Sequence, residues 1–516
     1  MTTAQIAPQQ RDAIAFLTNP ASYPSMPPVE RIDTHGAHVF LCGSDVFKIK
    51  RAIRYPYMDF STLEKRHAAC VRELEVNAPN APMIYKSLVA ITRAYDGRMA
   101  FAGDGDPVEW AVHMTRFQER DVLANRIVSE PISDKEAKGL ADAVYAAHAA
   151  AVVIQQPPPA AQISRVATDV LAALTSLFGP EDQTIVAGLR ARLTSGATDL
   201  SDLLLRRARD GHVRRCHGDL HLGNIVFIDG HATLFDAIEF DETLATIDTL
   251  YDLAFLLMDL DHRDHRATAN AVLNRYLWRS QPLSNIEALA ALPVFLALRA
   301  AIRAMVGAQK AVLSAHPSSE PRGYLQRALS YLHEEVPALV LIGGLSGSGK
   351  STLASALAPS FGRAPGALHL RSDLERKALF NADEFERLPA SAYTAAATAA
   401  VYDRMLVKTQ AALRAGHSVI ADAVHADPGE RTAIAALAGA TGARLASLWL
   451  DVPANILMER VAQRKNDASD ATPQVVEQQL AYGLGPLDWT RLDASGPFEE
   501  TLRMAMSHLH ANFDTR

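Results

Sequence analysis

The chain of 516 residues is longer than one hydrophobic core usually organises, so two or three domains are expected. Its 48% hydrophobic and 21% charged residues are an ordinary globular composition, which excludes wholesale disorder. A net charge of −7 and three cysteines without paired spacing exclude a general nucleic-acid-attracting surface and a disulfide framework, and they favour reduced, intracellular thiols.

The amino-terminal segment lacks a basic stretch followed by an apolar one, so no secretory signal is seen. Apolar stretches such as Ala288 to Ile302 are interrupted, here by Pro293 and Arg299, and none reaches the roughly 18 uninterrupted residues of a membrane helix. We therefore expect a soluble, cytoplasmic protein that has no membrane partner.

The front part of the chain predicts a small sheet-rich lobe followed by a larger helical one. Residues 1–30 are a leader with a short helix around 11–17, and the two lobes are expected over 31–120 and over 121–336, the latter including a linker. The elements expected along these lobes are strands at 39–41 and 46–50 around a turn, a helix at 64–77, strands within 83–118, and helices at 135–154, 250–260, 267–279 and 286–313.

The segment 216–224 reads Cys-His-Gly-Asp-Leu-His-Leu-Gly-Asn and precedes a strong hairpin signal. Apolar runs flank an Asp-Gly dipeptide at 229–230, which suits a tight turn with positive φ. Counting outward from this turn places Asn224 and Asp236 together at the open end of the hairpin, with Asp219 facing the same space. Such oxygen ligands suit Mg²⁺, and a third carboxylate can accept the proton of an acceptor hydroxyl.

The pattern His-Gly-Asp-x-x-x-x-Asn followed by an Asp resembles the aminoglycoside phosphotransferase branch of the protein-kinase-like fold, over roughly residues 30–330. The resemblance implies an α+β, bilobal domain that binds ATP. It implies that Asp219 is the catalytic base and that Asn224 and Asp236 hold the metal. Glu239 is a further candidate near the metal or the substrate.

The same resemblance implies a strand lysine on the nucleotide phosphates and a helix acid that pairs with it. Lys48 and Lys50 alternate onto one strand face, so spacing does not choose between them, although Lys48 is preferred. Glu73 is the expected acid and Glu64 the alternative. The Gly-rich GxGxxG loop of kinases does not occur here.

Two neighbours of the motif are expected to be structural rather than reactive. His217 should support the loop without acting in catalysis, and Asp252 should be a buried carboxylate that organises its helix.

The clearest linker signal spans 316–323, and the domain boundary is expected near Pro337. Beyond it, strand-like runs alternate with helical ones, which favours an α/β domain with a mainly parallel sheet over 337–516. The strand-like runs lie at 338–342, 368–371, 418–421 and 445–450.

A second phosphate-binding signature follows the first of these strands and opens a helix, as a P-loop requires. Its glycines allow backbone N–H groups to close around phosphate, Lys350 would bridge the terminal phosphates, and the Ser351 hydroxyl would bind Mg²⁺. The expected nucleotide-binding residues are Gly344, Ser346, Gly347, Ser348, Gly349, Lys350, Ser351 and Thr352.

Other candidates lie at strand ends, where open parallel sheets bind their ligands. Asp373 is expected to orient or deprotonate an acceptor hydroxyl, with a helix-capping role as the alternative. Asp422 is expected to hold Mg²⁺ through water. Arg460 and Arg464 lie one helical turn apart and are expected to clamp the transferring phosphate, with a solvated basic face as the alternative.

Residues 338–516 resemble small P-loop kinases that include gluconate kinase and zeta-toxin-like enzymes, on the P-loop, Arg371-Ser372-Asp373 and the segment 460–472. The order of both halves is similar to a bacterial family in which an aminoglycoside phosphotransferase-like domain is fused to a P-loop kinase. The resemblance implies the fold class: a protein-kinase-like domain followed by an α/β P-loop NTPase domain.

The sequence thus predicts a bifunctional phosphotransferase with one kinase site in each half, dependent on ATP, or GTP, and Mg²⁺. Its partners would be small-molecule acceptors with a hydroxyl, such as a sugar or aminocyclitol, and no nucleic acid is expected. Two alternatives stay open. The P-loop half can be a nucleotide-gated switch that regulates the front kinase, or it can act on nucleic-acid ends or nucleotide sugars.

Overall fold

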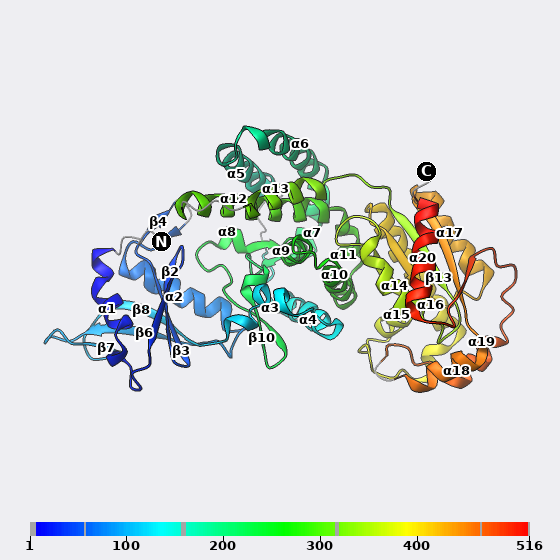
Figure 1. The fold of residues 1–516 in the computed structure, drawn as a ribbon, viewed down its shortest axis with the longest axis horizontal. Coiled ribbons are helices and arrows are strands. Elements are labelled where there is room, and N and C mark those ends of the chain that lie inside the picture. The colour runs from blue at the N-terminus through cyan, green and yellow to red at the C-terminus, as the bar shows by residue number, and fades with distance from the viewer. Residues whose placement is uncertain (1–6, 56–57, 156–160, 315–318, 465–466, 514–516) are drawn as a thin grey trace. The chain divides into compact units, whose positions relative to one another are not determined.

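The computed structural model describes residues 7–55, 58–155, 161–314, 319–464 and 467–513 (Figure 1). Two compact units make up the chain. The first contains Met1–Val166, Leu204–Leu256 and Val306–Ser319, and the second contains Ala167–Leu203, Leu257–Met305 and Glu320–Arg516. The predicted linker at 316–323 lies partly outside the described residues, and the boundary near Pro337 stays a prediction.

The first unit contains a six-stranded antiparallel sheet in the order β1-β2-β3-β8-β6-β7, together with a short hairpin of β4 and β5. The strands predicted at its front are present. Their bounds are Val29–Asp33, Ala37–Cys42, Asp45–Lys50, Arg54–Tyr55, Met58–Asp59, Tyr85–Arg93, Met99–Phe101 and Asp106–Thr115 for β1 to β8.

Strand β3 has two faces with different partners. Phe47 and Ile49 are buried in a cluster with Leu17 of helix α1 (Arg11–Thr18), the short helix predicted in the leader. Because side chains alternate along a strand, Lys48 and Lys50 share the opposite face. Helix α2 (Leu63–Asn77) contacts β3 and β8, and it begins where the Thr62 hydroxyl accepts a hydrogen bond from the Lys65 N–H.

Strands β10 (Ile225–Ile228) and β11 (His231–Leu234) form the predicted hairpin, and both turn residues have positive φ. Its register matches the count from the turn, which confirms that prediction. The other elements wholly or partly in this unit are α3 (Leu123–Ser129), α4 (Asp134–Ala150), α5 (Ala161–Leu177), α7 (Ser201–Arg209), β9 (Val213–Arg215), α8 (Glu242–Ala245), β12 (Thr246–Asp248) and α9 (Thr249–His262).

The second unit contains a five-stranded sheet in the order β14-β15-β13-β16-β17, in which every neighbouring pair is parallel. The four predicted strands are present, whereas β17 was not predicted because its sequence, Thr-Arg-Leu-Asp, is short and polar. The bounds of β13 to β17 are Ala338–Gly343, Leu368–Arg371, Val419–Asp422, Arg444–Asp451 and Thr490–Asp493.

Helices form the rest of the second unit. They are α6 (Gln183–Asp199), α10 (Arg266–Ser280), α11 (Leu283–Glu287), α12 (Leu292–Ser314), α13 (Glu320–Tyr331), α14 (Lys350–Leu357), α15 (Ser372–Leu379), α16 (Ala395–Arg414), α17 (Pro428–Thr441), α18 (Ala454–Gln463), α19 (Pro473–Leu480) and α20 (Phe498–Phe513), with α12 continuing into the first unit.

The stretch predicted as helical over 286–313 is helical but interrupted. The structure has α11, a 3-10 turn at Ala288–Ala290 and then α12, with Pro293 in the first turn of α12, where a missing N–H costs no helical bond. Among the described residues, the stretch Leu292–Val312 of α12 is long and apolar enough to cross a membrane, but more than half of it is buried inside the protein, as in a core helix.

Candidate active sites

The loop after β9 brings Asp219 and Asn224 together in the first unit. The Asn224 amide nitrogen donates to the Asp219 backbone carbonyl at 2.9 Å and to its carboxylate at 3.1 Å. The hairpin fixes the next candidate, because the Phe235 N–H donates to the Asn224 carbonyl at 3.0 Å and Asp236 follows directly. The three oxygen-bearing side chains predicted for this site therefore come from one loop and the adjoining hairpin end.

Asp252, in the first turns of α9, holds the backbone of this loop. Its carboxylate accepts hydrogen bonds from the N–H groups of His217 at 3.1 Å and Gly218 at 2.9 Å, and it lies 3.1 Å from the His148 ring. Asp252 is fully buried. These contacts agree with the structural role predicted for Asp252 and extend it from the helix to the loop.

His217 connects the loop to the hairpin. Its Nε2 lies 2.9 Å from the Phe235 carbonyl, and its Nδ1 lies 3.3 Å from the Asp219 N–H. Burial lowers the pKa of His217, so the ring is neutral and donates from Nε2 to the carbonyl while Nδ1 accepts. His217 therefore positions Asp219 and the residue before Asp236, as a supporting residue would.

Both candidate lysines of β3 contact the expected acid of α2. Lys48 Nζ lies 2.8 Å from one carboxylate oxygen of Glu73, and Lys50 Nζ lies 2.6 Å from the other. Lys48 also lies 2.5 Å from Asp236, whereas Lys50 pairs with Glu239. Lys48 is thus the lysine beside the expected metal ligand, and Glu239 lies beside the second lysine.

Charge balance sets the protonation of this network. Burial alone would raise the pKa of Glu73 and of Asp236, but the lysine ammonium groups hold both below their ordinary values. Burial raises the pKa of Glu239. The alternative acid Glu64 lies in the first turn of α2, and it is exposed, whereas Glu73 is buried.

Three contacts around Asp236 were not predicted. Its backbone has φ of +59°, uncommon outside glycine, and its N–H donates to the Tyr85 hydroxyl at 3.1 Å. The Asn77 side chain accepts from the Ala237 N–H at 2.8 Å and donates to the Glu73 carbonyl at 3.0 Å. No local pattern reveals these contacts, because Asn77 and Tyr85 are distant in sequence from the loop they hold.

The donor set of this site fits a magnesium ion. With the Asn224 amide nitrogen donating to Asp219, its amide oxygen is the atom left for a cation, and the Asp236 carboxylate is ionised and 44% exposed. Mg²⁺ takes one or two protein oxygens and completes its shell with phosphates and water. Asn224 and Asp236 are therefore the residues that would hold it.

In the second unit, the predicted P-loop connects β13 to α14. Gly347 has φ of +91°, and a Cβ there would come within 2.8 Å of the Leu457 carbonyl, so this position requires glycine. Lys350 Nζ donates to the Leu345 carbonyl at 3.0 Å, and burial lowers the pKa of Lys350. The loop and the partly buried lysine therefore have the local geometry that the motif predicted.

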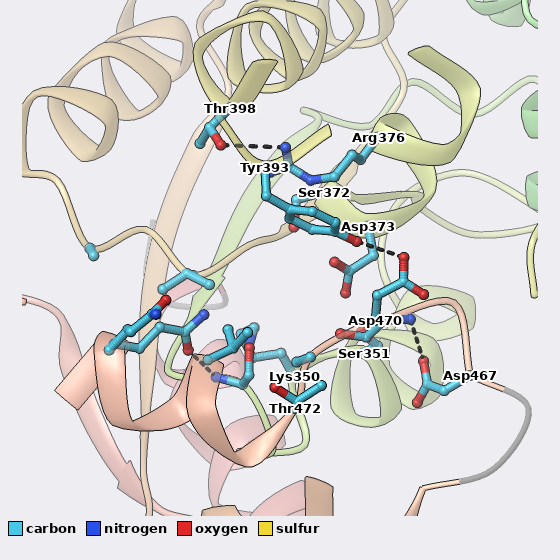
Figure 2. Close-up of a pocket in the computed structure, with 18 of the residues that line it drawn as sticks. Lys350, Ser351, Ser372, Asp373, Arg376, Tyr393, Thr398, Asp467, Asp470 and Thr472 are labelled. Atoms are coloured by element: carbon cyan, nitrogen blue, oxygen red, sulfur yellow. Dashed lines mark hydrogen bonds between the residues drawn. The ribbon is translucent and has the colours of Figure 1, made fainter. Parts of the chain in front are cut away.

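A cavity of about 780 Å³ opens in front of this loop. Figure 2 shows Lys350, Ser351 and Asp373 around it. The predicted residues that line it are Ser346, Gly349, Lys350, Ser351, Thr352, Asp373 and Arg464, whereas Gly344, Gly347 and Ser348 belong to the same loop but not to the lining.

Asp422 ends β15, the strand beside β13, and is buried. The ring of His369, on β14, lies 3.3 Å from its carboxylate. Burial alone would raise the pKa of Asp422, but the His369 hydrogen bond lowers it to about 2, with Lys350 contributing. An ionised acid near the P-loop lysine fits the binding of a hydrated cation, so Ser351 and Asp422 would hold it. His369 was missed by sequence reasoning.

The predicted clamp of Arg460 with Arg464 is not formed. Helix α18 ends at Gln463 and Arg464 is extended, so the two side chains do not share one helix face. The Arg460 guanidinium donates to the carbonyls of Ala494 at 2.9 Å and Ser495 at 3.3 Å, while Arg464 lines the cavity.

Asp470 fixes the cavity wall formed by residues 467–472. Its carboxylate lies 2.8 Å from Lys377 Nζ, and it accepts from the Tyr393 hydroxyl at 2.6 Å and the Leu388 N–H at 3.0 Å. Helix α19 also contacts the P-loop: the Ser346 N–H donates to the Gln479 side chain at 2.8 Å. Neither residue was singled out from the sequence.

Comparison with known families agrees with these two sites. Residues 72–292 match the phosphotransferase enzyme family, and residues 339–484 match an AAA domain family. The chain therefore carries a kinase-like phosphotransferase domain followed by a P-loop domain. This confirms both the predicted fold class and the resemblance drawn from the two motifs.

Two relatives align with this chain over nearly their whole length. Proteins of Mycobacterium tuberculosis and Mycobacterium bovis, each described as uncharacterized, are 26% identical over 485 residues, which cover 92% of this chain and 94% of each relative. The alignment therefore includes both halves in one polypeptide.

Two solved structures each match part of the chain. A choline/ethanolamine kinase family protein from Mesorhizobium loti is 15% identical, covers 63% of this chain and 99% of its own, and has a TM-score of 0.37. A gluconokinase from Sinorhizobium meliloti is 20% identical, covers 35% of this chain and 95% of its own, and has a TM-score of 0.25.

Proposed function

We propose that this protein is a bifunctional phosphotransferase that transfers the γ-phosphoryl group of ATP, with Mg²⁺, to hydroxyl groups of small molecules at one site in each half. The observation that carries the proposal is the contact of Lys48 with both Glu73 and Asp236, beside the hydrogen-bonded pair of Asp219 and Asn224. Phosphoryl transfer depends mostly on such positioned charges.

At the front site, Asp219 orients the acceptor hydroxyl and accepts its proton as the oxygen attacks the γ-phosphorus. The bond from the γ-phosphorus to the β,γ-bridging oxygen breaks, and ADP leaves. Lys48, held by Glu73, neutralises charge on the phosphates. A magnesium ion on Asn224 and Asp236 would neutralise further charge on the phosphate oxygens.

At the rear site, backbone N–H groups of the P-loop and Lys350 hold the phosphates, and Asp373 orients the acceptor hydroxyl from the cavity wall. Arg464, in the same lining, neutralises charge on the transferring group. The cavity of about 780 Å³ has room for a nucleotide together with a small acceptor. Arg460 has no part in this proposal, because backbone carbonyls bind its guanidinium.

The composition supports a cytoplasmic location and small-molecule partners. The net charge of −7 gives no general attraction for nucleic acid, and the three cysteines, all among the described residues, are buried thiols outside any disulfide. Sugars and aminocyclitols are the first acceptors to screen.

The test uses the full chain and four forms of it: the parent, Asp219→Asn, Lys350→Ala and the double variant. A metabolite library is incubated with γ-labelled ATP, and bound nucleotide is counted by calorimetry. We expect two nucleotides per chain in the parent and one in Lys350→Ala. Each single substitution should remove a different set of labelled products.

Products lost in both single variants alike, or one nucleotide per chain in the parent, would contradict two independent kinase sites. Turnover of the front acceptor that changes with Lys350→Ala, without any product of the rear site, would favour a nucleotide-gated switch. Labelled nucleic-acid ends or nucleotide sugars would reassign the rear acceptor.

A further inference from the structure

Helix α10 provides hydrogen bonds to the edge strand of the parallel sheet in the second unit. Strand β14 pairs with β15 on one side and ends the sheet order. The Asn274 amide oxygen accepts from the His369 N–H of β14 at 2.7 Å, and its nitrogen donates to the Ala367 carbonyl at 3.2 Å. One side chain thus bonds two edge groups of the backbone, as a neighbouring strand would.

The same helix contacts the sheet region along much of its length. The Asn270 side chain donates to the Ala367 carbonyl at 3.0 Å. The Trp278 indole donates to the Leu374 carbonyl at 3.0 Å, and Arg275 lies 2.8 Å from Glu384. A Cβ at Gly366, which has φ of +123°, would come within 2.9 Å of the Asn270 amide nitrogen, so glycine permits this close approach.

Strand β14 carries two groups that bear on the rear site. The ring of His369 contacts the buried Asp422. Asp373, which lines the cavity, follows the end of the strand by two residues. The backbone N–H that Asn274 binds therefore belongs to the residue whose side chain contacts the expected metal-binding acid.

An unbonded strand edge is a weak point of a sheet, because its backbone groups are free to exchange partners with water or other chains. Losing the acceptor for the His369 N–H, which is partly buried, has a free-energy cost if no other group replaces it. That cost falls on the strand that sets the position of His369 and Asp373.

We infer that Asn274 is a positioning residue of the rear phosphotransfer site. It acts through β14. It holds the His369 ring against Asp422, and it holds Asp373 at the cavity wall. The inference rests on the proposed kinase function of that site. Asn274 lies within residues 72–292, which match the phosphotransferase family. The rear site therefore depends on a residue outside the P-loop segment that begins at β13.

The test uses the full chain carrying Asp219→Asn, so that ATP turnover reports the rear site. Asn274→Leu removes the bonds to the His369 N–H and to the Ala367 carbonyl while keeping a side chain of similar size. Arg279→Gln is the matched control on the same helix, since it removes an ion pair of 3.3 Å to Asp383, whose side chain is 83% exposed. Steady-state turnover is measured together with hydrogen exchange of the segment 367–373.

We expect Asn274→Leu to lower rear-site kcat about tenfold or more, since a small misplacement of reacting groups has effects of that size, with the KM for ATP changed less than about twofold. Exchange should become faster at 367–373, and Arg279→Gln should match the parent in both measurements. Asn274→Asp keeps the acceptor for the His369 N–H and loses the donor, so its kcat should lie between those of the parent and Asn274→Leu. This variant replaces Asn274→Leu in the test if Asn274→Leu does not fold.

Unchanged kcat in folded Asn274→Leu, or reduced kcat with unchanged exchange at 367–373, would overturn the inference. Failure of the proposed function has a different signature, because Lys350→Ala would then leave the turnover of the Asp219→Asn chain unaltered.

Discussion

Lys50 Nζ lies 2.6 Å from one carboxylate oxygen of Glu73, whose other oxygen pairs with Lys48 at 2.8 Å. One buried acid thus holds two lysines of the same strand. The lysines differ in their second partner, because Lys48 reaches Asp236, whose side chain is 44% exposed, whereas Lys50 reaches Glu239, whose side chain is 8% exposed. This difference predicts different functions for the two cations.

Lys48→Met should abolish most front-site activity, lowering kcat/KM by about 10²-fold or more, because it removes the cation beside the expected metal ligand. Lys50→Met should instead destabilise the first unit by about 3–5 kcal/mol, since it leaves Glu239 without its lysine and the buried Glu73 with only Lys48. Front-site kinetics and urea unfolding separate the two effects.

The control for this pair is Lys65→Met. Lys65 is 49% exposed and pairs with Asp59, so its loss should change stability by less than about 1 kcal/mol. If Lys50→Met lowered front-site kcat/KM as much as Lys48→Met at equal stability, the assignment of Lys48 to the phosphates would fail.

Asp219→Asn should lower front-site kcat by about 10²–10⁴-fold with little change in melting temperature, because it removes the proton acceptor while keeping the shape of the loop. Asp252→Ala should lower both the front-site kcat and the melting temperature, since it leaves the buried N–H groups of His217 and Gly218 without their acceptor. The comparison needs kinetics and thermal unfolding on the same samples. Equal melting temperatures for Asp252→Ala and the parent would contradict its structural role.

The local parts of this architecture could be predicted from the sequence. The Asp-Gly turn fixed the hairpin register, and therefore the placement of Asn224 with Asp236, because a two-residue turn sets every pair that follows. The P-loop could be predicted because strand, glycines and helix are contiguous.

Contacts between distant segments could not be predicted. Lys48 and Asp236 are 188 residues apart, and Asp470 meets Lys377 across 93 residues. The pairing of Arg460 with Arg464 failed for a local reason, since the helix ends at Gln463, one residue before Arg464. Choosing between Lys48 and Lys50 likewise required knowing where the hairpin end lies.

Acid should destabilise the second unit partly through His425. This side chain is fully buried, and burial lowers its pKa to about 4. The unfolded chain binds a proton near its ordinary pKa of about 6.5, so the stabilisation is complete above that value and is lost as pH falls toward 4, by about 3 kcal/mol.

His425→Leu should therefore lose less stability than the parent between pH 7 and pH 4, whatever its stability at pH 7. Thermal unfolding across this range measures the difference. His231→Leu is the control, because His231 is exposed on β11 and should follow the parent. Parallel pH curves for His425→Leu and the parent would show that His425 does not titrate as its burial requires.

The contact of Asp470 with Lys377 should be important for the wall of the rear cavity. Lys377 is 1% exposed, so Asp470→Asn leaves a buried ammonium without its counter-ion and should destabilise the second unit by about 3–5 kcal/mol. Lys377→Met should behave similarly. The double variant Lys377→Met with Asp470→Asn should be more stable than the sum of the single effects predicts, because no unpaired charge remains.

An exposed pair in the same unit is the control for this cycle. Arg491 and Asp451 form an ion pair in which the side chains are 60% and 39% exposed, and its coupling energy should be below about 1 kcal/mol. Urea unfolding of all four forms of each pair gives the coupling energies. Tyr393 and the Leu388 N–H also bind Asp470. Asp470→Asn should therefore also raise the KM of the rear site for the acceptor. A coupling energy for Lys377 and Asp470 no larger than that of the exposed pair would mean that burial does not strengthen this contact.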